Sequence, residues 1–325
     1  MVLTQKVKRN TSLSGRGHVL SRKAKVRIGR TAALLFVLPA AVLFSVFVLY
    51  PMLAAFAYAF SDWHGTARGQ FAGFANFATL FTREPYKTAV LFAFLHNLLI
   101  FVAAVIAQNT LGMALAYAIH RLHWGKRFFQ TIYALPYLVS PIVIGYLWTL
   151  LLSPMFGPVN KLLQAIGLGN LALPWLGNPH TAIWVLVLVV VWQWLGFPVL
   201  LYGAALGGVP AELEDAASLD GASGRQRFFS ITLPLLTPAI TTVSVLGFIG
   251  AMEAFTIPYA LGGSTGSPAG STDVLALVFY RVAFESGDSN GIGMSSALAT
   301  LLFAFVFGIA VLATGIMRKW GESLT

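Results

Sequence analysis

The sequence predicts an all-α integral membrane protein with six transmembrane helices. Three observations lead to this fold class. The chain of 325 residues is 57% hydrophobic and only 10% charged, whereas soluble domains carry about 25% charged residues. It contains six long apolar runs, and its basic residues gather on one of the two sides that these runs define. The composition therefore indicates one membrane domain without a large soluble one.

Each predicted span is an apolar run long enough to cross a bilayer with some tilt, because about 20 apolar residues suffice for a helix. Prolines occur inside several runs, for example Pro136, Pro198 and Pro258. In a membrane such breaks persist where neighbouring helices or water satisfy the freed backbone groups. They indicate either a bundle with an internal cavity or simple kinks. The six runs cover residues 31–60, 90–118, 128–152, 180–206, 235–261 and 295–317.

Basic residues are distributed unevenly over the connections. Residues 1–30 hold nine of the 21 Lys and Arg and no acidic residue. When the connections are assigned alternately to two sides, 16 of the 21 fall on the side of this tail. By the positive-inside rule we expect both termini in the cytosol. The sequence thus predicts a basic cytosolic tail at 1–30, a transmembrane domain at 31–318 and a short cytosolic tail at 319–325.

The partner of the basic tail is expected to be the membrane surface. Clustered Lys and Arg beside a span are attracted to anionic lipid headgroups. No aromatic-interleaved recognition module accompanies them, so we expect no nucleic-acid partner. The apolar run that follows the tail is far longer than the hydrophobic core of a signal peptide, and we expect no cleavage there.

The sequence contains few candidate catalytic residues. The chain has no cysteine, which excludes disulfides, Cys nucleophiles and thiolate metal sites. Its six histidines are scattered, and no cluster of Asp, His or Arg marks a membrane face. We therefore expect no catalytic residue and no metal site, and an integral membrane enzyme such as a lipid transferase is disfavoured.

A polar segment separates the fourth and fifth runs. Pro210 suits the first turn of a helix, and three acids follow where a helix N-terminus favours negative charge. We expect a short helix over 210–220, a turn at Gly221 and a second short helix that Ser223 caps and that ends near Leu233, before Pro234. The three acids are Glu212, Glu214 and Asp215.

Two functions are compatible with this segment. The small side chains of Ala216 and Ala217 would let another protein approach the first helix closely, which indicates a docking element. The alternative is an amphipathic loop that lies on the headgroups without a partner. The order of the residues favours docking, because DAASLDGASGRQRFFSITLP resembles the EAA motif of ABC importer permeases. The positions that match are Asp215, Ala216, Ala217, Asp220, Gly221, Ile231, Leu233 and Pro234.

One position departs from the motif. The leading acid is Asp215, preceded by Glu214, where the motif has a glutamate. The substitution shortens the acidic arm by one methylene group. Elsewhere, residues 128–160, 192–217 and 267–303 resemble the carbohydrate-uptake branch of these permeases, in particular the first permease subunit of maltose-type systems. Unlike that subunit, this chain lacks a large inserted external domain.

The resemblance implies a type I ABC importer permease fold in the inner (plasma) membrane of a bacterial cell. It implies as partners a second homologous permease subunit, two cytosolic ATPase subunits and an external solute-binding protein. This chain has no G-x-x-x-x-G-K-[ST] phosphate loop, so ATP and Mg²⁺ are expected on the partner ATPase and no cofactor on this chain. The resemblance assigns the ATPase contact to Glu214, Asp215, Ala216, Ala217, Asp220 and Gly221.

A sugar path needs aromatic faces and hydrogen-bonding groups in a concave site. Trp192, Gln193 and Trp194 in the fourth run and Glu253 in the fifth offer them. An intramembrane carboxylate usually faces a cavity or a partner, so Glu253 is expected either to line the path or to join an ion pair or inter-subunit bond. Together with the resemblance, these residues predict a path past Trp192, Gln193, Leu195, Gly196, Val199, Met252 and Glu253.

Other readings stay open. His96, Asn97, Gln108 and Asn109 could line the path, although such groups more often bond across helices. The solute could be glycerol-phosphate, an amino acid or an ion instead of a sugar. A self-sufficient secondary carrier is a further alternative, but it leaves the polar segment unexplained.

Overall fold

The structure, a computed structural model, describes the backbone of residues 21–322 and the side chains of residues 33–315. Most of the predicted basic tail, residues 1–20, and the last three residues of the C-terminal tail lie outside the described residues. The chain divides into two units, Met1–Ala54 and Ala55–Thr325. In the first, helix α1 (Ser21–Phe44) passes through a π-helical turn η1 (Ser45–Leu49) into α2 (Tyr50–Ala59), whose last residues belong to the second unit.

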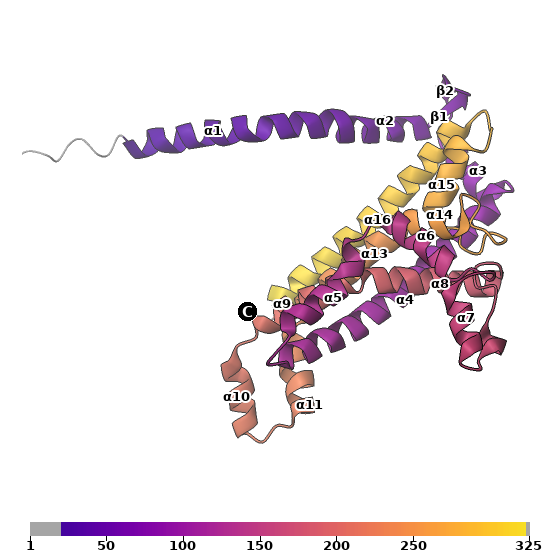
Figure 1. The fold of residues 1–325 in the computed structure, drawn as a ribbon. Helices are drawn as coiled ribbons and strands as arrows, with labels where there is room; N and C mark the ends of the chain where they lie inside the picture. The colour runs from indigo at the N-terminus through magenta and orange to yellow at the C-terminus, as the bar shows by residue number, and fades with distance from the viewer. Residues whose placement is uncertain (1–20, 323–325) are drawn as a thin grey trace, which may run out of the picture. The chain divides into compact units, whose positions relative to one another are not determined.

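The second unit is a bundle of helices with a two-stranded sheet (Figure 1). Its first elements are β1 (Ser61–His64), β2 (Ala67–Phe71), α3 (Ala75–Thr82), α4 (Tyr86–Arg121), α5 (Lys126–Leu138), α6 (Pro141–Leu151), α7 (Pro158–Ala165) and η2 (Gly169–Leu171). There follow α8 (Pro179–Trp194), α9 (Gly196–Gly207), α10 (Ala211–Leu219), α11 (Gly224–Arg227), η3 (Phe228–Thr232), α12 (Leu233–Leu235), α13 (Thr237–Met252), α14 (Thr256–Gly262), α15 (Leu275–Phe284) and α16 (Gly291–Glu322).

Within the described residues, four helical segments are long and apolar enough to cross a membrane: Ala33–Ala59, Tyr86–Arg121, Pro179–Gly207 and Gly291–Gly315. The number rises to six if each of two bent helix pairs counts as one span. The chain is thus a largely helical protein with four to six candidate spans. The prediction of six continuous helices was too simple at the third and fifth runs.

The third run is broken in the middle. Helices α5 and α6 meet at an angle of 93°. Pro141 begins α6, and Ser140 before it is extended, with φ −56° and ψ 130°. A proline disfavours the helical conformation of the residue that precedes it, which explains why 128–152 is not one straight helix.

The fifth run differs at both ends. The segment Gly224–Leu235 runs on past Pro234 and is bent by 62° from α13, so the expected helix end before Pro234 was wrong. Pro234 lies in the first turn of α12, where a missing N–H is tolerated. At the other end α13 stops at Met252, and Glu253 is its C-cap. Residues 235–261 are therefore two helices, α13 and α14, joined by a break that begins at Glu253.

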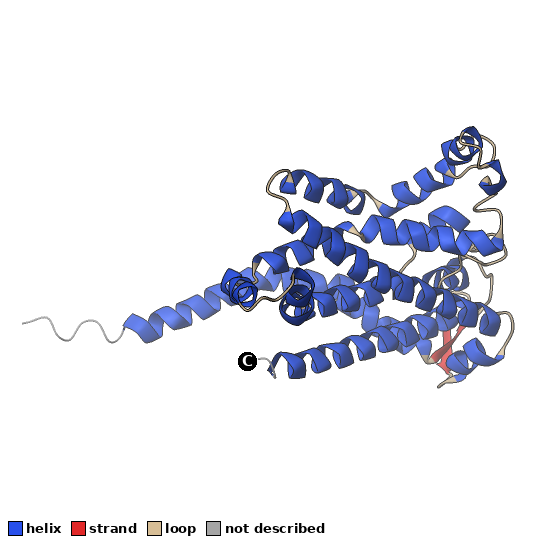
Figure 2. Cartoon of the chain, turned by 90° about the horizontal axis from the view of Figure 1, so that it is seen from below, coloured by secondary structure: helices blue, strands red, loops and turns tan. Residues whose placement is uncertain are grey.

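Helix α4 is the centre of the bundle. It packs against α5, α8, α9 and α13, and near its N-terminal end against α3 and α15. Figure 2 shows the small sheet at one end of the bundle. At that end the Asn76 amide donates to the carbonyl oxygens of Ala59 and Ser61, and the Asn290 amide donates to Asn76. These bonds join the end of α2, the β1–β2 hairpin, α3 and the start of α16.

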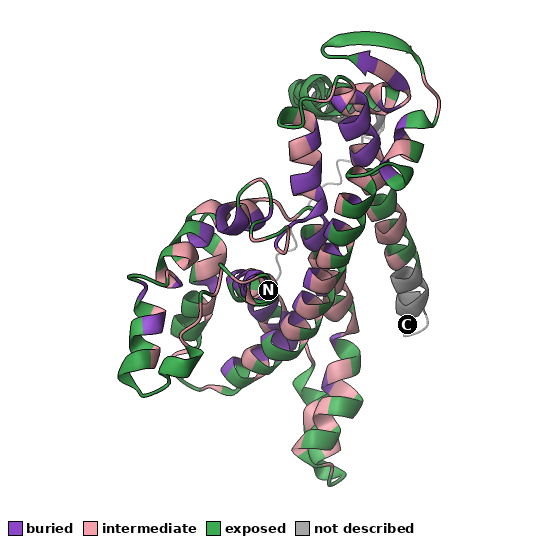
Figure 3. Cartoon of the chain, turned by 90° about the vertical axis from the view of Figure 1, so that its right-hand side faces the viewer, coloured by how far each residue is buried: buried purple, intermediate pink, exposed green. Residues whose placement is uncertain are grey.

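Burial separates the bundle from a projecting segment. Buried side chains form three apolar clusters along the bundle, around Leu186, Val278 and Tyr202. Residues 211–227, which we call the α10–α11 segment, are all exposed or half-buried. The segment projects from the bundle at the end opposite the sheet (Figures 1 and 3).

Candidate functional site

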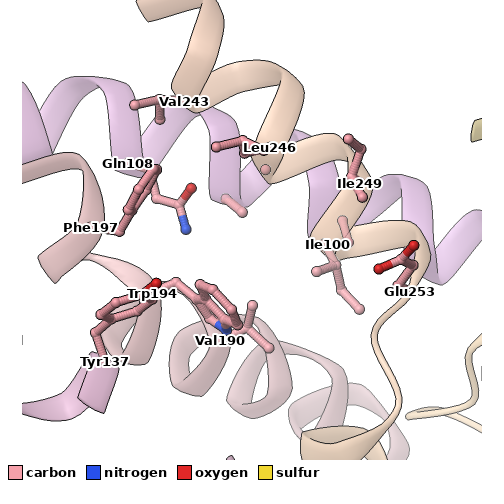
Figure 4. A pocket seen from close by; sticks show the side chains of 14 residues that line it. Ile100, Gln108, Tyr137, Val190, Trp194, Phe197, Val243, Leu246, Ile249 and Glu253 are labelled. Atoms are coloured by element: carbon pink, nitrogen blue, oxygen red, sulfur yellow. The ribbon is translucent and has the colours of Figure 1, made fainter. Parts of the chain in front are cut away.

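A cavity of about 310 Å³ lies inside the bundle between α4, α5, α8, α9 and α13. One wall of the cavity is a face of α4. Its lining residues Ile100, Ala104 and Gln108 are spaced four apart, so they share one face of that helix. Figure 4 shows Ile100 and Gln108 beside the space, with Tyr137 and Trp194 across it. The remaining lining residues are Tyr137, Val190, Trp194, Phe197, Val243, Leu246, Gly247, Ile249, Gly250, Ala251 and Glu253.

The walls are mainly apolar, with four polar side chains: Gln108, Tyr137, Trp194 and Glu253. The rings of Tyr137 and Trp194 pack edge to face, with centroids 5.4 Å apart. A Cβ on Gly247 would come within 3.4 Å of the Gln108 side-chain oxygen, so a small residue there leaves room for the amide. An apolar cavity with a few converging polar groups is the usual form of a small-molecule site.

The sequence predicted Glu253 inside the fifth span, but it lies at the end of α13, as the C-cap of that helix. Its N–H donates to the Ile249 carbonyl at 3.0 Å and closes the last turn of the helix. Its side chain is exposed, and the carboxylate lies at one end of the cavity (Figure 4). The break in the fifth run thus places the carboxylate where it can reach a solute.

Asn97 fixes the backbone beside Glu253. Its amide nitrogen donates to the Ala251 carbonyl at 2.6 Å, and its side-chain oxygen accepts from the Leu275 N–H at 2.9 Å. On the same helix, His96 Nδ1 lies 2.8 Å from the Asp273 carbonyl oxygen. Both side chains bond across elements, whereas Gln108 lines the cavity.

The other predicted path residues lie outside the cavity lining. Trp192 packs edge to face on Trp148 at 5.6 Å. Gln193 is buried and its amide donates to the Val139 carbonyl at 3.0 Å, beside the break between α5 and α6. Gly196 allows α5 to approach, because a Cβ there would lie 2.3 Å from the Tyr133 carbonyl oxygen.

The remaining three also lie outside this lining. Val199 and Met252 are buried, and Leu195 is half-buried at the junction of α8 and α9. Of the seven predicted residues, Glu253 alone lines the cavity. The part of the other six in a solute path stays a prediction.

The α10–α11 segment has the local structure that its sequence predicts. Helix α10 carries Glu212 and Glu214 in its first turn. Gly221 has φ +80°, a conformation that glycine adopts without strain. Ser223 then caps α11 in a reciprocal arrangement with Gln226. The result is a short helix, a tight turn and a second capped helix.

The six residues assigned to the ATPase contact lie on the first of these helices and the turn. Asp215, Ala216, Asp220 and Gly221 are exposed, and Glu214 and Ala217 are half-buried. Directly after the segment, the ring of Phe228 packs edge to face on the ring of Tyr117 of α4, with centroids 5.0 Å apart. The aromatic contact joins the base of the segment to the bundle and leaves its tip uncovered.

The residues that the structure describes contain no group of three or more His, Asp or Glu side chains that could hold a metal ion.

Comparison with known proteins decides the family. Residues 108–320 match the model of the binding-protein-dependent transport system inner membrane component. The chain belongs to this family. The match begins at Gln108, the last of the cavity-lining residues on α4, and includes the whole α10–α11 segment, so the resemblance drawn from residues 214–234 is confirmed. As a member of this family the chain is a multi-pass membrane protein.

Relatives of this transport family match nearly the whole chain. It is 26% identical over 300 residues to the probable starch degradation products transport system permease protein AmyD of Thermoanaerobacterium thermosulfurigenes, covering 92% of this chain and 98% of that protein. It is 32% identical over 285 residues to the diacetylchitobiose uptake system permease protein NgcF of Streptomyces coelicolor, covering 84% of this chain and 80% of that protein. These relatives are permease subunits.

The fold also matches a solved transporter. A chain in the crystal structure of a bacterial alginate ABC transporter, in complex with an alginate pentasaccharide-bound periplasmic protein, aligns with a TM-score of 0.76 and 25% identity. The alignment covers 91% of this chain and 96% of that chain. The type I permease architecture inferred from the sequence therefore has a solved counterpart.

Proposed function

We propose that this chain is the transmembrane permease subunit of an ATP-driven importer that takes up a sugar or oligosaccharide delivered by an external solute-binding protein. The observation that carries the proposal is the exposed α10–α11 segment, which projects from a membrane bundle and bears the EAA-like sequence. The sugar relatives and the alginate-transporter fold support the class of solute.

In this proposal the α10–α11 segment couples the bundle to an ATPase subunit. Glu214, Asp215, Ala216, Ala217, Asp220 and Gly221 form the contact. ATP and Mg²⁺ bind the partner ATPase, and closure of the ATPase pair moves the segment. Because Phe228 packs on Tyr117, movement of the segment is transmitted to α4, which lines the cavity. Such coupling requires that the ATPase contact differ between the two states of the importer.

The cavity is the proposed solute site of this subunit. Tyr137 and Trp194 offer ring faces and edges to a sugar, while Gln108 and Glu253 offer hydrogen-bonding groups. The mainly apolar walls would bury the ring faces of the sugar. A second, homologous permease would complete the pathway.

The proposed topology follows from the candidate spans and from the distribution of basic residues. We place six spans in a bacterial inner membrane, with each bent pair counted as one span, and both termini in the cytosol. The α10–α11 segment then faces the cytosolic ATPases, and the sheet with α3, α7 and α15 faces the binding protein. The permease domain covers 31–318, with the coupling loop at 209–234.

The test is the ATPase activity of the complex co-purified from its host, with binding protein and a panel of sugars. Gly221→Pro cannot keep φ at +80°, because proline locks φ near −65°. The matched control is Gly224→Ala, where an added Cβ meets nothing within 4 Å.

We expect a sugar-loaded binding protein to stimulate hydrolysis in the parent and in Gly224→Ala and not in Gly221→Pro. Purification without any ATPase subunit, or equal stimulation in all three versions, would contradict the coupling role.

A further inference from the structure

Glu253 is the one charged residue among those that line the cavity. The other thirteen lining residues are uncharged, and none of the described Lys, Arg or His side chains is among them. The ion pairs within the described residues are His64 with Asp62 and Arg281 with Asp273. Within that part of the chain, the Glu253 carboxylate has no cationic partner.

The basic side chains on the elements next to Glu253 have other partners. Arg281 of α15 binds the Asp273 carboxylate through two nitrogens, at 2.9 and 2.5 Å, and also donates to the Ser264 carbonyl. His96 of α4 lies 2.8 Å from the Asp273 carbonyl oxygen. The cavity therefore presents a single carboxylate and no basic side chain.

We propose that Glu253 makes this cavity a filter against acidic solutes, so that the carried molecule is a neutral sugar or an amino sugar and not a uronate. The inference rests on the proposed function and names the class of solute within it. The fold is shared with a transporter of the acidic polysaccharide alginate, but the charge in the cavity of this chain favours another class.

The physical reason is the surrounding medium. The exposed Glu253 carboxylate lies at one end of the cavity, where the effective dielectric constant is that of a protein surface, and at a value of about 20 two like charges roughly 6 Å apart weaken binding by about a hundredfold. A neutral sugar instead donates hydroxyl hydrogen bonds to the carboxylate, which are stronger than bonds between uncharged groups. An ammonium group gains further attraction.

The experiment compares matched pairs of oligosaccharides. Each neutral trisaccharide, such as maltotriose, is compared with the same trisaccharide oxidised to carboxylates at C6. Binding to the assembled complex, without ATP and without binding protein, is measured by isothermal titration calorimetry. The variants are Glu253→Gln and the control Glu285→Gln, since Glu285 is also a helix C-cap but lies outside the cavity lining.

In the parent complex we expect, for at least one pair, that the oxidised trisaccharide binds ten to a hundred times more weakly than the neutral one. We call the quotient of their two dissociation constants the ratio. Glu253→Gln should reduce that ratio to about twofold, and Glu285→Gln should leave it unchanged. Raising the salt from about 50 to 500 mM should narrow the ratio in the parent and in Glu285→Gln, which both keep the Glu253 charge, and not in Glu253→Gln, because salt screens a charge. A steric role for Glu253 would not show this salt dependence.

Several outcomes would overturn the inference. Equal binding of acid and neutral sugar in the parent would mean that the second permease supplies a compensating cation. If the ratio is unchanged in Glu253→Gln, or if Glu285→Gln reduces it equally, a residue other than Glu253 discriminates between acidic and neutral sugars. If the Glu253→Gln complex fails to assemble, the parent alone decides the test: a ratio that does not narrow with salt would contradict the charge filter. If no neutral or acidic sugar binds the parent, the sugar path itself fails, whereas binding without discrimination removes the charge filter alone.

Discussion

Asn97 and Ala251, 154 positions apart in the chain, are joined by a 2.6 Å hydrogen bond from the Asn97 amide nitrogen to the Ala251 carbonyl oxygen. The same side chain accepts from the Leu275 N–H. One buried amide therefore joins α4, the end of α13 and the start of α15. Because Glu253 follows Ala251 by two residues, the position of its carboxylate depends on this amide.

Replacing Asn97 by leucine is expected to destabilise the fold by about 1–3 kcal/mol, since it leaves a buried carbonyl and a buried N–H without their partner. The measurement is the free energy of unfolding from a denaturant titration in detergent micelles. Thr110→Val serves as the control, because Thr110 is exposed and bonds only to its own helix. An Asn97 variant as stable as this control would show that the three segments are held by packing alone.

Gly196→Ala tests the close approach of α5 to α9. The added Cβ would lie 2.3 Å from the Tyr133 carbonyl oxygen, so the two helices must separate, at a cost of about 1–3 kcal/mol. Gly207→Ala on the same helix adds a methyl group that meets nothing within 4 Å, and it should be neutral or gain up to about 1 kcal/mol. Thermal unfolding of the two variants side by side separates steric conflict from a general effect of alanine.

The ion pair between Arg281 and Asp273 holds the segment before α15. Arg281→Met strands an Asp273 carboxylate whose side chain is only 8% exposed, which is expected to cost about 3–5 kcal/mol. The double variant with Asp273→Leu should recover most of that loss, because no charge is then buried alone. A double-mutant cycle of unfolding free energies measures this. Additive losses in the cycle would argue against direct pairing.

Asp288 gives the fold a pH-dependent contact. Hydrogen bonds from the Tyr86 hydroxyl, at 2.6 Å, and from the Asn290 N–H, at 3.0 Å, hold the pKa of Asp288 below its ordinary value of 3.8. The charged form is the one stabilised. The contribution to stability is therefore present above the unfolded pKa and is lost as the pH falls through the lower folded pKa.

Tyr86→Phe should cost about 0.5–1 kcal/mol at pH 7, because the contact is partly exposed. The difference between parent and variant should shrink below about pH 4. Thermal midpoints measured from pH 7 to pH 3 check this. A gap that stays constant across the range would mean that the hydroxyl acts through packing and not through the carboxylate.

The sequence predicts the spans well where a run is continuous and less well where prolines interrupt it. The second run appears as one helix, α4, because nothing breaks its backbone hydrogen bonds. The third run looks equally apolar, yet Ser140 is extended before Pro141 and the helix turns by 93°. Hydropathy measures length and polarity, and neither reports the angle at a break. The β1–β2 hairpin was missed, because the strands are short and their contacts, with α16 and with Asn76 of α3, come from residues distant in the chain.

The α10–α11 segment could be predicted in detail because its structure is local. A capping serine and a glycine at positive φ act within a few residues of themselves. The cavity could not be predicted in the same way. The spacing of Ile100, Ala104 and Gln108 marks one face of a helix, but only the neighbouring helices decide that this face borders a cavity. Glu253 was found because a carboxylate in an apolar run is conspicuous whatever surrounds it.

The break between α5 and α6 has an evolutionary consequence. It leaves the Val139 carbonyl without the partner that a continuous helix would supply four residues later, and the Gln193 amide from α8 takes that place. A homologue that loses the proline at position 141 could restore the continuous helix and would release position 193 from its need for an amide. Positions 141 and 193 are therefore expected to covary, although 52 residues separate them in the chain.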